Sequence, residues 1–213
     1  MIRLLLVDDH AVVREGYRRL LERRADLTIV GEAASGAEAC TLQRELNPDV
    51  VIVDLVLPDI SGIEVIRRLA QRQANCRMLA FTMHCNPLFA SQALKAGALG
   101  FVTKSSAPEV LIDAVYKVAC NERVLSPDIA PELALTLLDG TGEDLIQGLT
   151  SREFEVLRLL VHGCNSEEIG ARLHISPKTA HNIHYQIKAK LGARNDFDLM
   201  RIALRMKLAD VGE

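Results

Sequence analysis

The sequence of 213 residues has no long hydrophobic run and no extreme of net charge. No apolar stretch approaches the ~18 residues needed to cross a bilayer. The apolar start of the chain runs into Asp8 and Asp9 instead of a signal-peptide cleavage site. We therefore expect a cytoplasmic protein with no membrane partner. Because 49% of the residues are hydrophobic and 25% are charged, we expect a soluble globular chain, and its length favours two domains.

The cysteines also lack any paired motif. Their number is odd, they form no C-x-x-C pair, and no histidine stands near them at the spacing of a metal site. We expect reduced thiols, each buried as a small hydrophobic side chain. They are Cys40, Cys76, Cys85, Cys120 and Cys164.

The formal net charge of -3 conceals an uneven distribution along the chain. Residues 1–120 are neutral, residues 121–148 carry -5, and residues 149–213 carry +2. Within the last segment, Ser176 to Arg194 contains four basic residues and no acidic one. Such a stretch could face a polyanion.

Residues 1–120 alternate apolar runs with segments of helical periodicity. The expected strands are Leu4–Val7, Thr28–Val30, Val50–Val53, Met78–Phe81 and Phe101–Val102. The expected helices are Val12–Arg23, Gly36–Leu46, Gly62–Arg72, Pro87–Ala96 and Pro108–Cys120. Continuous apolar runs are typical of parallel strands buried on both faces. The alternation predicts an α/β domain with a five-stranded, parallel, doubly wound sheet.

The rest of the chain differs in character. Residues 121–148 are acidic and contain several prolines and glycines, so we expect a linker that begins with a short helix around Ile129–Leu138. From residue 149 to residue 213 no strand pattern remains. A small all-α domain is expected there, with helices at Ser151–Val161, Ser166–Leu173, Pro177–Leu191 and Asp196–Leu208.

Polar residues end the strands of the expected sheet. In a parallel sheet the carboxyl ends of the strands lie at one edge, where ligands bind. Asp8, Asp9 and Asp54 would therefore crowd together there, which favours a bound divalent cation, and oxygen ligands suit Mg²⁺. Thr82 and Lys104, at neighbouring strand ends, would supply donors for a phosphoryl group.

The same residues resemble a known family. Asp8-Asp9-His10, Asp54 followed by Leu57-Pro58 and Gly62, Thr82, and Gly100 to Lys104 look like the receiver domain of bacterial response regulators, over residues 1–120. The resemblance implies a flavodoxin-like fold, in which a sensor histidine kinase phosphorylates Asp54. It also implies a Mg²⁺ held by Asp8, Asp9, Asp54 and the main-chain carbonyl of Val56. Thr82 and Lys104 would contact the phosphoryl oxygens, and Phe101 would be the aromatic switch residue.

Two features bear on alternatives to this interpretation. Phosphatases resembling haloacid dehalogenases also use a strand-end aspartate, but they place a second one two residues later, where this chain has Val56. We therefore expect no enzyme. Met83 stands after Thr82, where receivers usually have a small residue, and we expect it to narrow access to Asp54.

The C-terminal segment resembles a second family. Leu149 to Leu157, Glu168-Ile169, Ile175 to Thr179 and Lys190-Leu191-Gly192 are similar to the LuxR-type helix-turn-helix, which spans about Ser166 to Tyr185. Together with the receiver, this implies a NarL/FixJ-group response regulator that binds double-stranded DNA as a homodimer. Independently, Ser176 and Pro177 suit the start of the second helix of such a motif.

Helical periodicity indicates which face of this helix contacts DNA. Ala180, Ile183, Ile187 and Leu191 form an apolar stripe that must pack inward. On the outer face, base contacts are expected from His181, Asn182 and Tyr185. Phosphate contacts are expected from Lys178, Thr179, Lys188 and Arg194.

The sequence thus predicts a transcriptional regulator controlled by phosphorylation. The alternative is a regulator that works without phosphorylation, whose receiver serves as a dimerisation or protein-interaction module because Met83 restricts the pocket.

Overall fold

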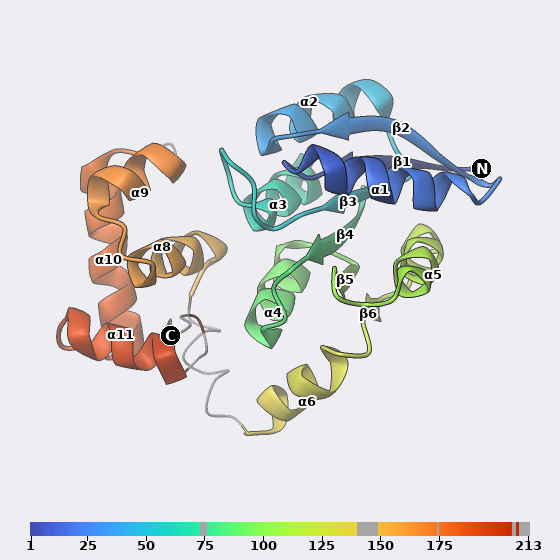
Figure 1. The fold of residues 1–213 in the computed structure, drawn as a ribbon. Helices are drawn as coiled ribbons and strands as arrows, with labels where there is room; N and C mark the ends of the chain where they lie inside the picture. The colour runs from blue at the N-terminus through green and yellow to red at the C-terminus, as the bar shows by residue number, and fades with distance from the viewer. Residues whose placement is uncertain (73–75, 140–148, 174, 206–207, 209–213) are drawn as a thin grey trace. The chain divides into compact units, whose positions relative to one another are not determined.

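The computed structural model of the protein describes residues 1–72, 76–139, 149–173, 175–205 and 208 (Figure 1). They form two compact units, Met1–Leu133 and Ala134–Glu213. The division falls inside the expected linker, of which residues 140–148 lie outside the described residues. The first unit extends beyond residue 120 because Ile129 and Leu133 are buried, with 0% and 7% exposure.

A parallel sheet forms the centre of the first unit. Its strands are β1 (Ile2–Val7), β2 (Leu27–Ala33), β3 (Val50–Val53), β4 (Arg77–Thr82), β5 (Gly100–Thr103) and β6 (Val124–Leu125), in the order β2-β1-β3-β4-β5-β6. The parallel α/β fold is confirmed, but the expectation of five strands is wrong, because β6 pairs with Gly100 and Phe101 of β5. A strand of two residues is too short to produce a periodic signal.

Helices cover both faces of this sheet (Figure 1). They are α1 (Ala11–Glu22), α2 (Gly36–Leu46), α3 (Gly62–Arg72), α4 (Pro87–Ala96) and α5 (Pro108–Ala119), with α6 (Ala130–Asp139) after β6. Helices α2, α3 and α4 pack side by side, whereas α1 and α5 contribute to one hydrophobic cluster with the sheet. Among the described residues, no helix combines the length and apolar character that membrane spanning requires.

Burial and capping explain these elements. All four residues of β3 have at most 2% exposure, as expected for a central parallel strand. Ser35 accepts a hydrogen bond from the Glu38 amide and starts α2, and Asn86 followed by Pro87 starts α4 in the same way.

Three of the five cysteines follow the expectation of burial. Cys40, Cys76 and Cys164 are buried and free, and burial raises the pKa of the Cys76 thiol to about 11. Cys85 and Cys120 are exposed, so for these two the expectation was wrong.

The second unit contains α8 (Ser151–Val161), α9 (Ser166–Leu173), α10 (Pro177–Leu191) and α11 (Asp196–Arg205). Gly163 and Gly192 adopt positive φ angles of 79° and 66° at the ends of α8 and α10. Residues 206 and 207, within the expected last helix, and residue 174, within the expected turn, lie outside the described residues. Leu199 and Ala203 of α11 are buried in the core of this unit.

Candidate functional site

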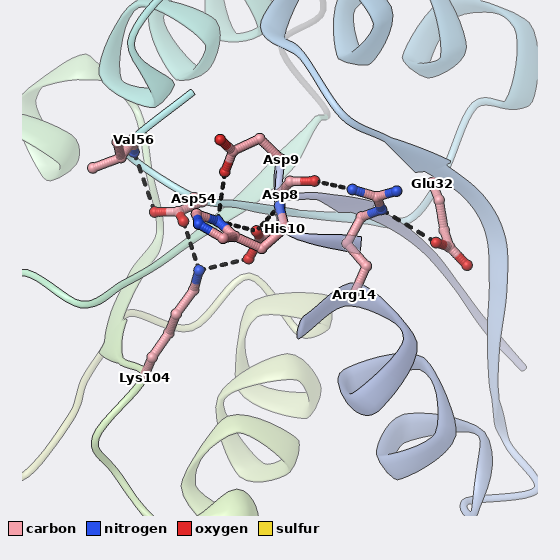
Figure 2. Close-up of polar contacts among 8 residues, drawn as sticks. All are labelled: Asp8, Asp9, His10, Arg14, Glu32, Asp54, Val56 and Lys104. Carbon is pink, nitrogen blue, oxygen red and sulfur yellow. Dashed lines mark hydrogen bonds and ion pairs between the residues drawn. The ribbon is translucent and has the colours of Figure 1, made fainter. Parts of the chain in front are cut away.

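Three strand ends of the first unit bring charged side chains together (Figure 2). Asp8 follows β1, Asp54 follows β3 and Lys104 follows β5. The Lys104 ammonium nitrogen lies 2.5 Å from Asp8 Oδ2 and 2.6 Å from Asp54 Oδ2. The strand order places β3 beside β1 and separates it from β5 by β4 alone, so residues far apart in sequence meet at one edge.

This cluster is almost closed to solvent. The side chains of Asp8, Asp54 and Lys104 have 8%, 6% and 7% exposure. Burial disfavours the Lys104 ammonium, but hydrogen bonds to Asp54 and Asp8 outweigh that effect and raise its pKa above the ordinary value. The lysine is therefore a permanent cation between two carboxylates.

The backbone around Asp54 is tightly packed. Asp54 Oδ1 accepts a hydrogen bond from the Val56 amide at 3.2 Å. A Cβ on Gly62 would lie 1.9 Å from the Asp54 carbonyl oxygen, so only glycine fits where α3 begins. Packing at Gly62 thus constrains the main chain at Asp54 and Leu55.

Oxygen donors at this edge suit a divalent cation. Asp8, Asp9 and His10 have potential ligand atoms within 4.8 Å of one another, and Asp8 and Asp54 already converge on a single ammonium nitrogen. His10 Nδ1 lies 2.7 Å from Asp9 Oδ1, so it holds this carboxylate. The three carboxylates and the Val56 carbonyl are all hard oxygen donors, as Mg²⁺ prefers.

Arg14 supports the turn that carries the acidic pair, a role that the sequence interpretation missed. Its side chain is 15% exposed, and Nη1 donates a hydrogen bond to the Asp8 carbonyl oxygen. Nε lies 3.3 Å from Glu32 Oε2 (Figure 2). No local pattern could have revealed this, because the contact between Arg14 and Glu32 crosses from α1 to β2 and depends on the fold.

The other residues expected at this site lie on β4 and β5. Thr82 has 0% exposure, and its carbonyl oxygen accepts a hydrogen bond from the Lys104 amide at 2.8 Å. Phe101 is also fully buried. Met83, expected to narrow the pocket, is 67% exposed to solvent.

A second candidate site is formed by α9 and α10. Ser176 accepts a hydrogen bond from the Thr179 amide and starts α10, with Pro177 as its first residue. Gly170 of α9 allows a close approach, since a Cβ there would lie 2.8 Å from the Ile175 carbonyl oxygen. The two helices thus pack as a helix-turn-helix unit.

The faces of α10 divide into an inner and an outer set. Ala180, Ile187 and Leu191 have 1%, 0% and 4% exposure, whereas Ile183 is only partly buried. His181 and Tyr185 are exposed and stack edge to face, with ring centroids 5.0 Å apart. Asn182, Lys178 and Thr179 are exposed as well. These side chains are available to a partner.

Most cations of the basic segment are already paired with acids. Lys188 Nζ lies 2.9 Å from Asp196 Oδ1, and Arg194 Nε lies 2.9 Å from Asp198 Oδ2. Lys190, which lies between them in sequence, is 2.7 Å from Glu153 Oε2 of α8. These acids stand outside the basic segment, so the local charge is lower than the sequence suggests.

Two families match the two units. Residues 4–116 match the response regulator receiver domain, and residues 147–203 match the bacterial regulatory proteins of the luxR family. Both matches fall on the segments that carry the two candidate sites.

Similar proteins match along nearly the whole chain. Response regulator UvrY of Escherichia coli K12 is 33% identical over 211 residues, which cover 99% of this chain and 97% of UvrY. Transcriptional regulatory protein UhpA of the same strain is 39% identical over 201 residues, covering 94% of this chain and 97% of UhpA.

A solved structure of a DNA-bound protein is also similar along most of the chain. RcsB from Salmonella enterica serovar Typhimurium, bound to promoter rprA in the presence of phosphomimetic BeF3-, is 28% identical with a TM-score of 0.72. The match covers 94% of this chain and 97% of the RcsB chain.

Proposed function

Since this chain belongs to the NarL/FixJ group of two-component response regulators, we propose that phosphorylation of Asp54 controls its binding to DNA through α10. The observation that carries the proposal is the convergence of Asp8, Asp54 and Lys104 in a buried cluster. We assign residues 1–120 as the receiver, 121–148 as the linker and 149–213 as the DNA-binding domain.

The proposed reaction transfers a phosphoryl group from a phosphohistidine of a sensor histidine kinase. A carboxylate oxygen of Asp54 attacks phosphorus, the P–N bond breaks, and the imidazole leaves with its electron pair and takes up a proton. The Lys104 ammonium, 2.6 Å from Asp54 Oδ2, is close enough to neutralise the charge of the transferred oxygens. The Thr82 hydroxyl is proposed as a hydrogen-bond donor to the same oxygens.

We assign Mg²⁺ as the cofactor of this reaction. Asp8, Asp9, Asp54 and the Val56 carbonyl would hold it, and it supplies positive charge that makes the carboxylate attack on an anionic phosphoryl group possible. Lys104 alone cannot neutralise three carboxylates and a phosphoryl group. The hard oxygen donors of the cluster support this assignment.

Phe101 is proposed as the residue that responds to the state of Asp54. It lies on β5, the strand that leads to Lys104, and it pairs with Ala80 of β4 on one side and with Leu125 of β6 on the other. A shift of Lys104 toward a phosphoryl group would therefore displace Phe101 and, through it, Leu125 at the start of the linker.

DNA recognition is assigned to α10. We propose that His181, Asn182 and Tyr185 contact base edges in the major groove, since their side chains are exposed on one face. Lys178, Thr179, Lys188 and Arg194 are proposed to contact phosphates. RcsB was solved bound to a promoter, which supports a DNA partner for this chain as well.

The assembly that binds DNA is proposed to be a homodimer. A two-fold pair places its recognition helices about 34 Å apart, one turn of the double helix. Because genomic DNA is the proposed target, we assign the protein to the cytoplasm. Its output is binding, so we assign it a regulatory rather than an enzymatic role.

Phosphorylation and DNA binding are tested together on the full-length protein. The protein is incubated with acetyl phosphate and Mg²⁺, its intact mass is measured, and its affinity for genomic fragments is compared before and after. We expect one added phosphoryl group and tighter DNA binding. If DNA binds but neither acetyl phosphate nor a kinase labels the protein, the receiver is instead a phosphorylation-independent interaction module.

A further inference from the structure

Asp196 contacts two residues of α10 from outside that helix. Its Oδ1 atom lies 2.9 Å from Lys188 Nζ and 2.9 Å from His184 Nε2. Asp196 is the first residue of α11, and it follows the acid-free segment that ends at Arg194. One carboxylate thus contacts two side chains of α10, the helix proposed to bind DNA.

The Asp196 carboxylate is not needed to start α11. Asn195 already accepts a hydrogen bond from the Asp198 amide at 2.8 Å, as an N-cap residue does. The Asp196 side chain is 70% exposed, so no packing requirement places an acid there. A helix N-terminus favours negative charge only modestly.

Within this cluster, the full ion pair is between Lys188 and Asp196. Burial lowers the pKa of His184 below its ordinary value, so its imidazole is neutral at pH 7 and donates a hydrogen bond from Nε2. The pKa of Asp196 is lowered, first by its hydrogen bond from Lys188, so the carboxylate stays ionised. The Lys188 ammonium also lies 4.7 Å from the centre of the Tyr185 ring.

The Lys188 ammonium is therefore fixed beside Tyr185, a residue assigned to base contacts, and it is already neutralised. A DNA phosphate that binds Lys188 must replace Asp196 or lie next to it, with repulsion between two anions. The exposed position of Asp196 makes this exchange possible at a modest energetic cost.

We propose that Asp196 is a built-in counter-ion of the DNA-binding helix, which holds Lys188 and thereby lowers the affinity of the protein for the DNA backbone. The inference rests on the proposed function, namely that α10 binds DNA. If one DNA-binding domain has low affinity for DNA, tight binding requires both DNA-binding domains of a homodimer. This property suits a regulator whose dimerisation is controlled.

The test measures binding of the full-length protein to a random-sequence DNA duplex by fluorescence anisotropy over a range of salt concentrations. The variants are Asp196→Asn, Lys188→Gln and the double variant. Asp113→Asn is the control, since it removes one negative charge from an exposed position of α5 in the other unit. Asp196→Ser serves as a second substitution, and a thermal melt checks the fold of each variant.

We expect Asp196→Asn to raise affinity about threefold to tenfold and to steepen the salt dependence by about one released counter-ion. Lys188→Gln should weaken binding more in the Asp196→Asn background than in the wild type, because there the lysine binds a phosphate without first displacing Asp196. Asp113→Asn should leave both the affinity and the salt slope close to the wild-type values.

Two outcomes distinguish failure of the counter-ion role from failure of the proposed DNA-binding function. If the wild type binds DNA but Asp196→Asn and Asp196→Ser behave like Asp113→Asn, the counter-ion role is wrong while the proposed function stands. If neither the wild type nor any variant binds duplex DNA at low salt, the DNA-binding function itself is wrong.

Discussion

Two lysines show how differently the two units use charge. In the first unit, Lys104 lies between Asp8 and Asp54, and all three side chains are at most 8% exposed. In the second unit, Lys188 is 18% exposed and its partner Asp196 is 70% exposed. Both lysines are paired, but only the first pair is enclosed.

Burial decides whether the ion pairs of Lys104 and Lys188 can exchange their carboxylates for another anion. A buried cation and its carboxylates cannot separate without leaving charges unpaired in a medium of low dielectric constant, so they stay together until another charged group binds. An exposed pair contributes little to stability and can exchange its anion for another one. The enclosed cluster thus has the rigidity that the proposed phosphoryl transfer requires, and the exposed α10 pair has the accessibility that the proposed exchange with a DNA phosphate requires.

The largest expected effect concerns Asp54. Replacing it in the Asp54→Asn variant should abolish phosphate uptake, because the amide is a poor nucleophile, while Lys104 keeps its contact with Asp8. Intact mass after incubation with acetyl phosphate measures the loss, with Asp113→Asn as the control. Stoichiometric labelling of the Asp54→Asn protein at another aspartate would contradict the assignment.

A matched pair of substitutions tests the comparison of the two lysines directly. Lys104→Met should lower the free energy of unfolding by about 3 kcal/mol, because it leaves two buried carboxylates without their cation. Added Mg²⁺ should restore part of this loss. Lys188→Met should cost less than about 1 kcal/mol. Urea denaturation with and without Mg²⁺ gives these values, and equal losses for both variants would refute the comparison.

Base contacts on α10 should have an intermediate effect. Tyr185→Ala and Asn182→Ala should each reduce discrimination between operator and random DNA by about 1 to 3 kcal/mol. Lys178→Ala should instead weaken binding to both kinds of DNA, as expected for a phosphate contact. Anisotropy titrations with both duplexes separate these effects. A Tyr185 variant that loses affinity equally for both would argue against base contact.

A substitution of Arg14 tests whether the buried carboxylate cluster depends on the hydrogen bond from this side chain to the Asp8 carbonyl oxygen. In Arg14→Met the Asp8 carbonyl loses its donor, and we expect Mg²⁺ affinity to fall about tenfold. Calorimetric titration with Mg²⁺ measures this. Arg19→Met is the control, because Arg19 lies on the same helix but is 78% exposed and pairs only with Glu15 among the described residues. Equal affinities in the two variants would remove the role of Arg14.

Met83 should have the smallest effect. Because Met83 is 67% exposed, Met83→Ala should speed phosphorylation by small donors and loss of the phosphate by only about twofold. Mass spectrometry over time after mixing with acetyl phosphate gives both rates. A much larger acceleration would mean that Met83 closes the pocket in solution.

Regular elements with strong boundary signals were predictable. The ranges Gly36–Leu46, Gly62–Arg72 and Pro87–Ala96 were predicted as helices and occur with the same ends as α2, α3 and α4. Their caps, prolines and glycines act locally, so the sequence carries the information. Strand β6 was missed because its two residues become a strand only by pairing with β5.

The candidate site was partly predictable for a similar reason. A general rule of parallel sheets brings strand ends together, so Asp8, Asp54 and Lys104 could be grouped without coordinates. No such rule brings Arg14 of α1 to the Asp8 carbonyl or to Glu32. Those contacts depend on how one helix packs on two strands.

The sequence by itself determined the order of the elements, the acidic strand ends and the polar face of α10, because these follow from local periodicity and from the geometry of a parallel sheet. It also determined that Ser176 to Arg194 contains no acid. Only the tertiary structure decided that Lys188 pairs with Asp196 and Lys190 with Glu153, whereas Arg194 and Asp198 are four residues apart and pair locally. Packing of α8 and α11 against α10 brings Glu153 and Asp196 within 3 Å of these lysines, and electrostatic interactions depend on distance in space rather than on separation along the chain.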